Sequence, residues 1–249
     1  MQAYLTLTRR ELAGYFFSIT GYVIMAAVAL LIGLSFAILI KGLLNTPFSM
    51  PITELFYNSY LFWFILLLAT PIITMRLFAL EKFSGTFETL MTTPVSDAQV
   101  VAAKFTAALV FYMVMWLPLL ACILFLQHYT LEAAALDAGA VGSTFLGIFL
   151  LGCLFISLGC FASSLSRSQM TAAMIALALS VGLFLISFLA EQLPAADWKS
   201  QALAMFNLQD QMHDFAHGMV DTRSVVLCLS VAFFFLFLTL RVIESRRWK

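Results

Sequence analysis

The sequence predicts an all-α polytopic membrane protein. Hydrophobic residues make up 63% of the 249-residue chain, charged residues only 10%, and the mean hydropathy is +1.00. Soluble domains carry about 25% charged residues, so the composition excludes an ordinary soluble domain. The apolar runs are continuous and do not alternate with polar residues as the strands of a membrane β-barrel do, which favours helices.

Six apolar segments approach or exceed the length of about 20 residues that a helix needs to cross a hydrocarbon core of about 30 Å. They are residues 20–40, 56–79, 97–126, 141–165, 168–190 and 224–242. No internal repeat or low-complexity linker separates them, so we expect residues 1–249 to form one membrane domain. Pro71 and Pro118 are expected to kink the second and third spans. Gly147, Gly152 and Gly159 give the fourth span small residues for close helix packing.

The distribution of Lys and Arg predicts the orientation. If the N-terminus is cytoplasmic, ten of these residues fall in inner segments and three in outer segments. Asp and Glu run the other way, with five inside and eight outside. Positive charge concentrates on the cytoplasmic side of membrane proteins, so both termini are predicted to lie inside. We expect no cleavable signal peptide at the N-terminus, which lacks an apolar core and a small-residue cleavage site.

Residues 1–19 are predicted to form a separate interfacial helix on the cytoplasmic leaflet. Leu5, Leu12 and Phe16 can share one helical face. The charged residues assigned to this helix are Arg9, Arg10 and Glu11. The alternative is a simple basic flank of the first span.

One polar segment, EKFSGTFETLMTTPVS (residues 81–96), separates the second and third hydrophobic spans. Residues 82–93 are predicted to form a short cytoplasmic helix, because apolar residues at i, i+4, i+7 and i+8 fall on one face. These residues are Phe83, Phe87, Leu90 and Met91. Pro94 ends the turn, and Ser96 is expected to cap the next helix while Gln99 reaches back. The apolar face can dock in a groove of a partner or lie in the lipid interface, and the pattern leaves both open.

The stretch PIITMRLFALEKFSGTFETLMTTPVSDAQVVAAKF, residues 71–105, resembles the signature region of ABC-2 type exporter permeases. The pattern typical of that family is matched at Glu81, Gly85, Thr86, Glu88, Leu90, Pro94 and Lys104. Two further stretches, SITGYVIMAAVAL and LGCFASSLSRSQMTAAMIA, resemble the F subunit of the gliding-motility-type subfamily. The resemblance covers residues 1 to about 190, and we carry no functional residue onto the remainder.

The resemblance implies a dimeric assembly, in which each half has six helices and a coupling helix between spans two and three. Each half is expected to contact an ABC ATPase subunit, so the complex holds two ATPase copies, which bind ATP and Mg. The second half is another copy of the permease or a homologue. A further membrane subunit with an outer domain often accompanies such permeases. The expected location is the bacterial cytoplasmic membrane, in contact with lipids and without a nucleic-acid partner.

The resemblance also implies which residues couple the permease to the ATPase. These are Phe83, Gly85, Thr86, Phe87, Glu88, Leu90 and Met91. The apolar residues would contact the ATPase, Gly85 would allow close backbone approach, and Glu88 would set the register through a hydrogen bond or charge pair.

Several other classes of protein are excluded by what the sequence lacks. It contains no GxxxxGK[ST] phosphate-binding loop and no HExxH or GxSxG motif, so we expect no enzyme activity and no cofactor site in this chain. No charged residue falls clearly at mid-span, which argues against ion coupling. Arg76 and Lys104 lie near cytoplasmic span ends, where their side chains are expected to snorkel. The remaining alternatives are an exporter of an amphipathic or lipid-linked substrate and a non-transport mechanical or scaffold subunit.

The outer segment 191–223 contains His213 and His217 at i, i+4 spacing, with Asp210 and Asp214 nearby. Imidazole and carboxylate ligands suit a divalent metal ion such as zinc or copper. The same residues also fit the solvated face of an amphipathic surface helix, and we adopt this interpretation, which predicts no metal ligand.

Overall fold

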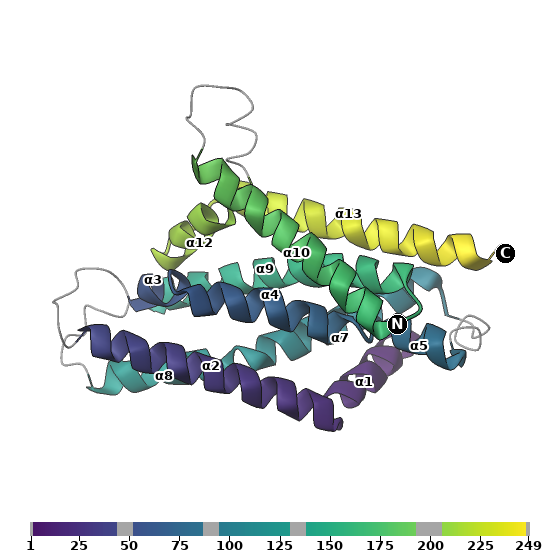
Figure 1. Ribbon diagram of the computed structural model, residues 1–249, viewed down its shortest axis with the longest axis horizontal. Helices are drawn as coiled ribbons and strands as arrows, with labels where there is room; N and C mark the ends of the chain where they lie inside the picture. The colour runs from purple at the N-terminus through teal and green to yellow at the C-terminus, as the bar shows by residue number, and fades with distance from the viewer. Residues whose placement is uncertain (1, 44–51, 87–94, 130–137, 193–205, 248–249) are drawn as a thin grey trace.

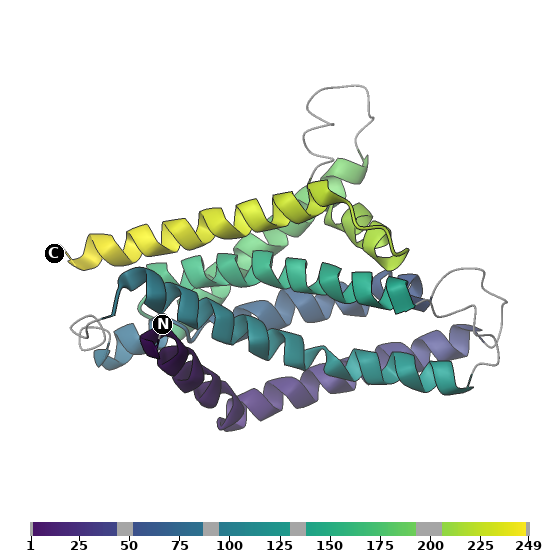
Figure 2. The ribbon, with the colours of Figure 1, turned by 180° about the vertical axis from the view of Figure 1, so that it is seen from behind.

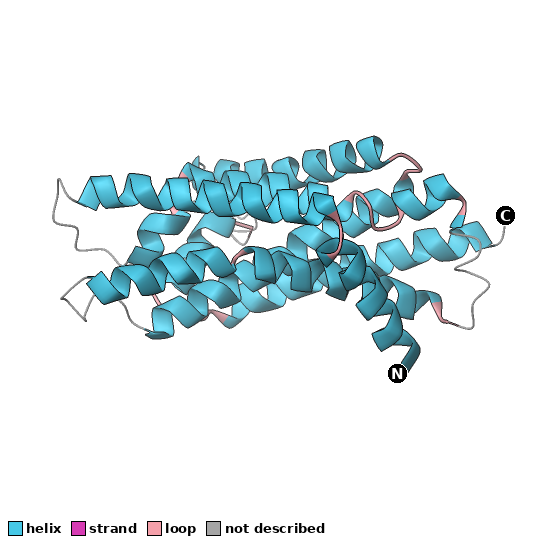
Figure 3. Ribbon diagram, turned by 90° about the horizontal axis from the view of Figure 1, so that it is seen from below, coloured by secondary structure: helices cyan, strands magenta, loops and turns pink. Residues whose placement is uncertain are grey.

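The computed structural model describes residues 2–43, 52–86, 95–129, 138–192 and 206–247. Within these residues every regular element is a helix (Figure 3). The helices are α1 (Gln2–Phe16), α2 (Ile19–Leu43), α3 (Ile52–Tyr57), α4 (Tyr60–Thr74), α5 (Ala79–Ser84), α7 (Asp97–Met115), α8 (Leu117–Tyr129), α9 (Ala138–Leu165), α10 (Gln169–Gln192), α12 (Leu208–Ala216) and α13 (Thr222–Arg247). Six stretches are long and apolar enough to cross a membrane, which confirms the predicted six-span, all-α fold.

The spans run along the long axis of one bundle (Figure 1). They are α2, α4 with α5, α7 with α8, α9, α10 and α13. Both termini and α5 lie at one end, which we call the α5 end, whereas α3 and α12 lie at the opposite end, the α12 end. This arrangement agrees with an even number of spans. That the α5 end is cytoplasmic stays a prediction from the Lys and Arg distribution.

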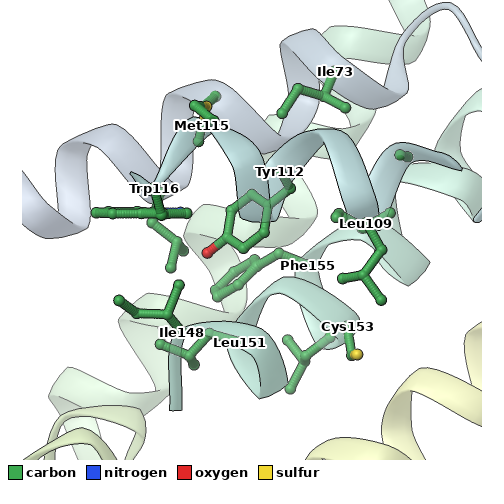
Figure 4. Packing of buried hydrophobic residues seen from close by; sticks show 14 of the residues in the cluster. Ile73, Leu109, Tyr112, Met115, Trp116, Ile148, Leu151, Cys153 and Phe155 are labelled. Atoms are coloured by element: carbon green, nitrogen blue, oxygen red, sulfur yellow. The ribbon is translucent and has the colours of Figure 1, made fainter. Parts of the chain in front are cut away.

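Helix α9 is the most buried span and packs against α4, α7, α10, α12 and α13; Figure 2 shows it between α7 and α13. Its glycines permit this burial. A Cβ atom added to Gly152 would lie 2.5 Å from Cε1 of Tyr112, and one added to Gly159 would lie 2.1 Å from Oγ1 of Thr74. The close packing predicted for this span is therefore present. Figure 4 shows the neighbouring core, with the rings of Tyr112, Trp116 and Phe155 packed between α7 and α9.

Gly159→Ala is expected to destabilise the protein by about 1–3 kcal/mol, because the added methyl group overlaps a buried side chain that cannot move without displacing α4. The measurement is thermal unfolding of the purified protein in detergent. Gly33→Ala is the matched control. A Cβ at Gly33 has no atom within 4 Å, and alanine favours a helix over glycine, so no loss is expected. Equal stability of the two variants would contradict the packing argument.

Two spans are interrupted close to the prolines that were predicted to kink them. The third span is divided into α7 and α8 at Trp116, immediately before Leu117 and Pro118. The second span contains Pro71 in α4 and leaves helical geometry after Thr74, before α5 resumes. Helix α5 is therefore a short segment at the end of the bundle, and other helices determine its position.

Candidate functional site

Four charged side chains meet at the α5 end of the bundle. Nζ of Lys104 on α7 lies 2.8 Å from Oε1 of Glu81 on α5 and 3.1 Å from Oε1 of Glu11 on α1. Nη2 of Arg10 lies 3.0 Å from Oε1 of Glu11 and 3.3 Å from Oε1 of Glu81. We call these four residues the ionic cluster. Its two cations and two carboxylates balance, and it joins three helices that are distant in sequence.

The ionic cluster is largely buried, unlike ion pairs on the protein surface. The Lys104 side chain is only 1% exposed, and the two carboxylates are 15% exposed. The ammonium group also lies 5.5 Å from the centre of the Phe78 ring. The expectation that Lys104 snorkels toward the membrane interface is therefore wrong. The lysine points into the protein because Glu11 and Glu81 compensate its charge there, which the isolated span could not reveal.

Helix α1 packs against α7, and the apolar face predicted for contact with the lipid interface is only partly covered. Leu5, assigned to the apolar face, is 63% exposed, and Leu12 and Phe16 are half-buried. The hydroxyl of Tyr4 donates to Oγ1 of Thr106 over 3.0 Å, on the same side as Glu11. The contact with α7 combines these polar pairs with aromatic packing, because the ring centroids of Tyr15 and Phe16 lie 4.9 Å and 5.5 Å from that of Phe111 on α7. Membrane contact by the remaining side of α1, where Arg9 is exposed, stays a prediction.

Side chains from other helices satisfy the backbone where the second span is broken. Oγ of Ser163 on α9 accepts from the N–H groups of Phe78 at 3.1 Å and Ala79 at 3.2 Å. The hydroxyl of Tyr15 on α1 donates to the Ile73 carbonyl over 2.9 Å. Burial raises the pKa of the Tyr15 phenol well above its ordinary value, so the phenol stays protonated and remains a donor. The break is therefore held at a fixed angle by α1 and α9.

Ser163→Ala is expected to destabilise the protein by about 1–3 kcal/mol, because it leaves two buried N–H groups without an acceptor. Amide hydrogen exchange at Phe78 and Ala79 should accelerate, and mass spectrometry of the corresponding peptide measures this. Ser230→Ala is the control, because Ser230 is exposed and bonds only to the Leu227 carbonyl of its own helix. Unchanged exchange at Phe78 and Ala79 in Ser163→Ala would show that Ser163 does not hold the break.

The structure describes part of the predicted coupling segment. Phe83 is 78% exposed at the end of α5, as a residue available to a partner would be. Gly85 ends α5 with φ of 74°, a left-handed conformation that favours glycine. The prediction of one helix over residues 82–93 is therefore wrong at this point, because α5 ends at Ser84. Oγ1 of Thr86 lies 2.8 Å from Oγ of Ser84. The other predicted coupling residues lie outside the described part of the chain: Phe87, Glu88, Leu90 and Met91.

The helix after this segment begins as predicted. Oγ of Ser96 accepts from the backbone N–H of Gln99 at 3.4 Å, which confirms Ser96 as the N-cap of α7. Asp97 follows in the first turn, where its charge is favourable.

The two histidines of the outer segment lie at the α12 end, His213 on α12 and His217 directly after it. Their neighbour is Glu54 of α3, and the predicted Asp210 instead accepts from Nδ2 of Asn207 at 2.6 Å. Sequence spacing could not identify Glu54, because it precedes His213 by most of the chain.

Sequence reasoning also missed the pairing of Glu81 with Lys104. Both residues had been noted as positions of the signature pattern, but only as separate matches. They are 23 residues apart, carry opposite charges, and flank the coupling segment on both sides. That combination is the feature from which the pair could have been inferred.

The comparisons with known proteins agree with this geometry. Residues 39–219, which span both the second to fifth membrane helices and α12, match the family model described as ABC-2 family transporter protein. No curated protein matches the chain. Permeases of this family are the membrane subunits of ABC transporters, work with an ABC ATPase, and contain no ATP site of their own. From its six-helix fold and this match over most of its length, the chain belongs to the ABC-2 transporter family as a transmembrane subunit.

Proposed function

We propose that this chain is the permease half of an ATP-driven exporter and that a coupling segment at residues 82–93 receives motion from a separate ATPase subunit. The observation that supports this most strongly is the position of α5. Helix α5 leads directly into the coupling segment, and the ionic cluster and Ser163 connect it to α1, α7 and α9. A displacement of the coupling segment would therefore move several helices together.

The contacts of Lys104 and Ser163 determine which helices would move with the coupling segment. ATP binding would bring two ATPase subunits together, and each would displace one coupling segment through contacts with Phe83, Phe87, Leu90 and Met91. Because Lys104 joins α5 to the start of α7, the second and third spans would tilt as a unit. Because Ser163 binds the break in the second span, α9 would follow. Closure of the ATPases would thus alter the pathway between the two permease halves.

The assembly would contain two ATPase subunits and a second permease copy or homologue in the bacterial cytoplasmic membrane. ATP and Mg would be bound by the ATPases alone. The spans α2, α10 and α13 are the least buried in the single chain, which leaves their apolar faces for lipid or for the second half. A gliding-type assembly with an additional membrane subunit carrying an outer domain is the more specific form of this proposal.

The substrate class that suits such a pathway is amphipathic or lipid-linked. The described spans are lined mainly by apolar side chains, and no Asp, Glu, Lys or Arg falls clearly at the middle of a described span. An apolar pathway favours molecules with a hydrophobic part and disfavours small ions.

The test is reconstitution of the permease with its co-expressed ATPase in liposomes made from lipids of the native membrane. An exporter is expected to hydrolyse ATP faster when amphipathic or lipid-linked compounds are added, and to move them across the bilayer. The second candidate is a mechanical or scaffold subunit of an envelope complex. It predicts an ATPase that binds the permease and hydrolyses ATP without stimulation or transport.

A further inference from the structure

A second cluster of side chains, which could act as metal ligands, lies at the α12 end, the end of the bundle opposite α5. It consists of Glu54 on α3, His213 on α12 and His217, which directly follows α12. Figure 1 shows α3 and α12 at this end. One possible ligand atom of each residue lies within 4.8 Å of those of the other two. We call these three residues the outer triad. The proposed transport mechanism does not use them.

The distances within the outer triad fit a shared cation. Nε2 of His217 lies 3.0 Å from Oε2 of Glu54, and Nε2 of His213 lies 3.5 Å from Oε1 of the same carboxylate. Ligand atoms about 2.0–2.1 Å from a tetrahedral zinc ion are separated from one another by about 3.3 Å. The two imidazole rings, one helical turn apart, have centroids 4.4 Å apart and an interplanar angle of 43°, so both reach the same carboxylate.

The carboxylate is buried and incompletely paired. The Glu54 side chain is 9% exposed, and its Oε2 accepts no hydrogen bond in the part of the chain that the structure describes. Nε2 of His217 lies 3.0 Å from this oxygen, at the distance of a shared ion's neighbouring ligands. A buried carboxylate oxygen without a donor is unfavourable, whereas a cation facing all three residues would compensate it.

The outer triad is also held in position by its surroundings. Oγ1 of Thr53 on α3 donates to the Ala216 carbonyl of α12 over 3.0 Å, next to both Glu54 and His217. Oγ of Ser143 on α9 donates to the Phe215 carbonyl over 2.5 Å. Preorganised ligands lose little freedom on binding, which favours affinity. The imidazole side chains are 48% and 32% exposed, so an ion can enter from solvent.

The geometry points to a site for a divalent transition-metal ion, with Glu54, His213 and His217 as protein ligands and water in the fourth position. The two-imidazole, one-carboxylate set is typical of zinc. The ion would connect the segment before the second span to the segment before the sixth. This replaces the solvated-face interpretation of the histidines, and it does not depend on the proposed function.

The test uses the full-length protein purified in detergent, stripped with EDTA and titrated with Zn²⁺ or Co²⁺. We expect one ion per chain after desalting, measured by elemental analysis, and a visible absorption band of the Co²⁺ form. Loss of one ligand in His217→Ala or Glu54→Gln should weaken binding by more than the roughly 10- to 100-fold that losses in the outer shell cost. Because His217 is partly exposed, its variant is expected to fold, and the metal-free thermal midpoint checks this.

Two control variants make the result specific to the outer triad. His128→Ala removes the third histidine of the sequence, and Asp214→Asn removes an acidic residue of α12, so both should retain the ion. Absence of binding in the unaltered protein overturns the proposal and leaves a plain His–Glu ion pair. Loss in the histidine variants with full binding in Glu54→Gln also overturns it, because α3 would then supply no ligand.

Discussion

Lys104→Met is expected to lower the free energy of unfolding by about 3–5 kcal/mol, the cost of removing one partner from a buried ion pair. The substitution leaves Glu11 and Glu81 at the same site with only Arg10, which is largely exposed, to offset them. The two carboxylates would repel each other in a poorly solvated position. The measurement is thermal unfolding in detergent, with size-exclusion chromatography to follow loss of the folded species.

Two further variants separate charge from volume. Adding Glu11→Gln and Glu81→Gln to Lys104→Met removes both carboxylates that Lys104 had compensated and leaves only the charge of Arg10, which is 56% exposed, so it should restore most of the stability. Arg241→Met removes an exposed pair with Glu244, 2.9 Å long, and should cost no more than about 1 kcal/mol. A loss in Lys104→Met equal to that in Arg241→Met would show that the ionic cluster contributes no more than a surface pair.

Combined replacement of Phe83 and Phe87 by alanine is expected to uncouple the permease from its ATPase while leaving the bundle folded. Removal of an aromatic residue at the centre of an interface typically costs about 2 kcal/mol or more, which corresponds to about 30-fold weaker binding. Phe83 is largely exposed, so its loss leaves no cavity in the permease. The affinity of the purified ATPase for the permease in nanodiscs and ATP-dependent export in liposomes are the two measurements.

The matched control for this pair is Phe233→Ala. Phe233 is as exposed as Phe83 but lies on the membrane-spanning helix α13, away from the coupling segment. Its loss should change neither ATPase affinity nor export. Unaltered ATPase binding in the Phe83, Phe87 double variant would place the contact elsewhere and remove the main support for the coupling proposal.

Local chemistry made much of this fold predictable from sequence. The six spans follow from the length of apolar runs, and the cap at Ser96 follows from side-chain reach within one turn. Each of these properties depends on residues that are close in the chain, so periodicity and spacing reveal them.

The contacts that define the candidate sites are of a different kind. Lys104 was assigned to the membrane interface because its own helix gave no sign of the two carboxylates that meet it. Leu5 was placed on the face that meets the lipid interface, which its exposure leaves open, whereas the packing of α1 against α7 through Tyr4 and Glu11 was not foreseen. Ser163 and Glu54 each act on a segment that is remote in sequence. Such pairings depend on tertiary packing, and the local patterns of a single sequence do not reveal them.

The close packing of Gly152 and Gly159 of α9 against side chains of other helices restricts which substitutions this protein can accept. A residue larger than glycine at position 159 requires a smaller one at position 74, and the same reciprocity links positions 152 and 112, because each pair shares a volume that only one member can fill. Natural variants of this chain should therefore change these positions in compensating pairs, and a library randomised at positions 159 and 74 together should recover functional combinations that neither single substitution allows.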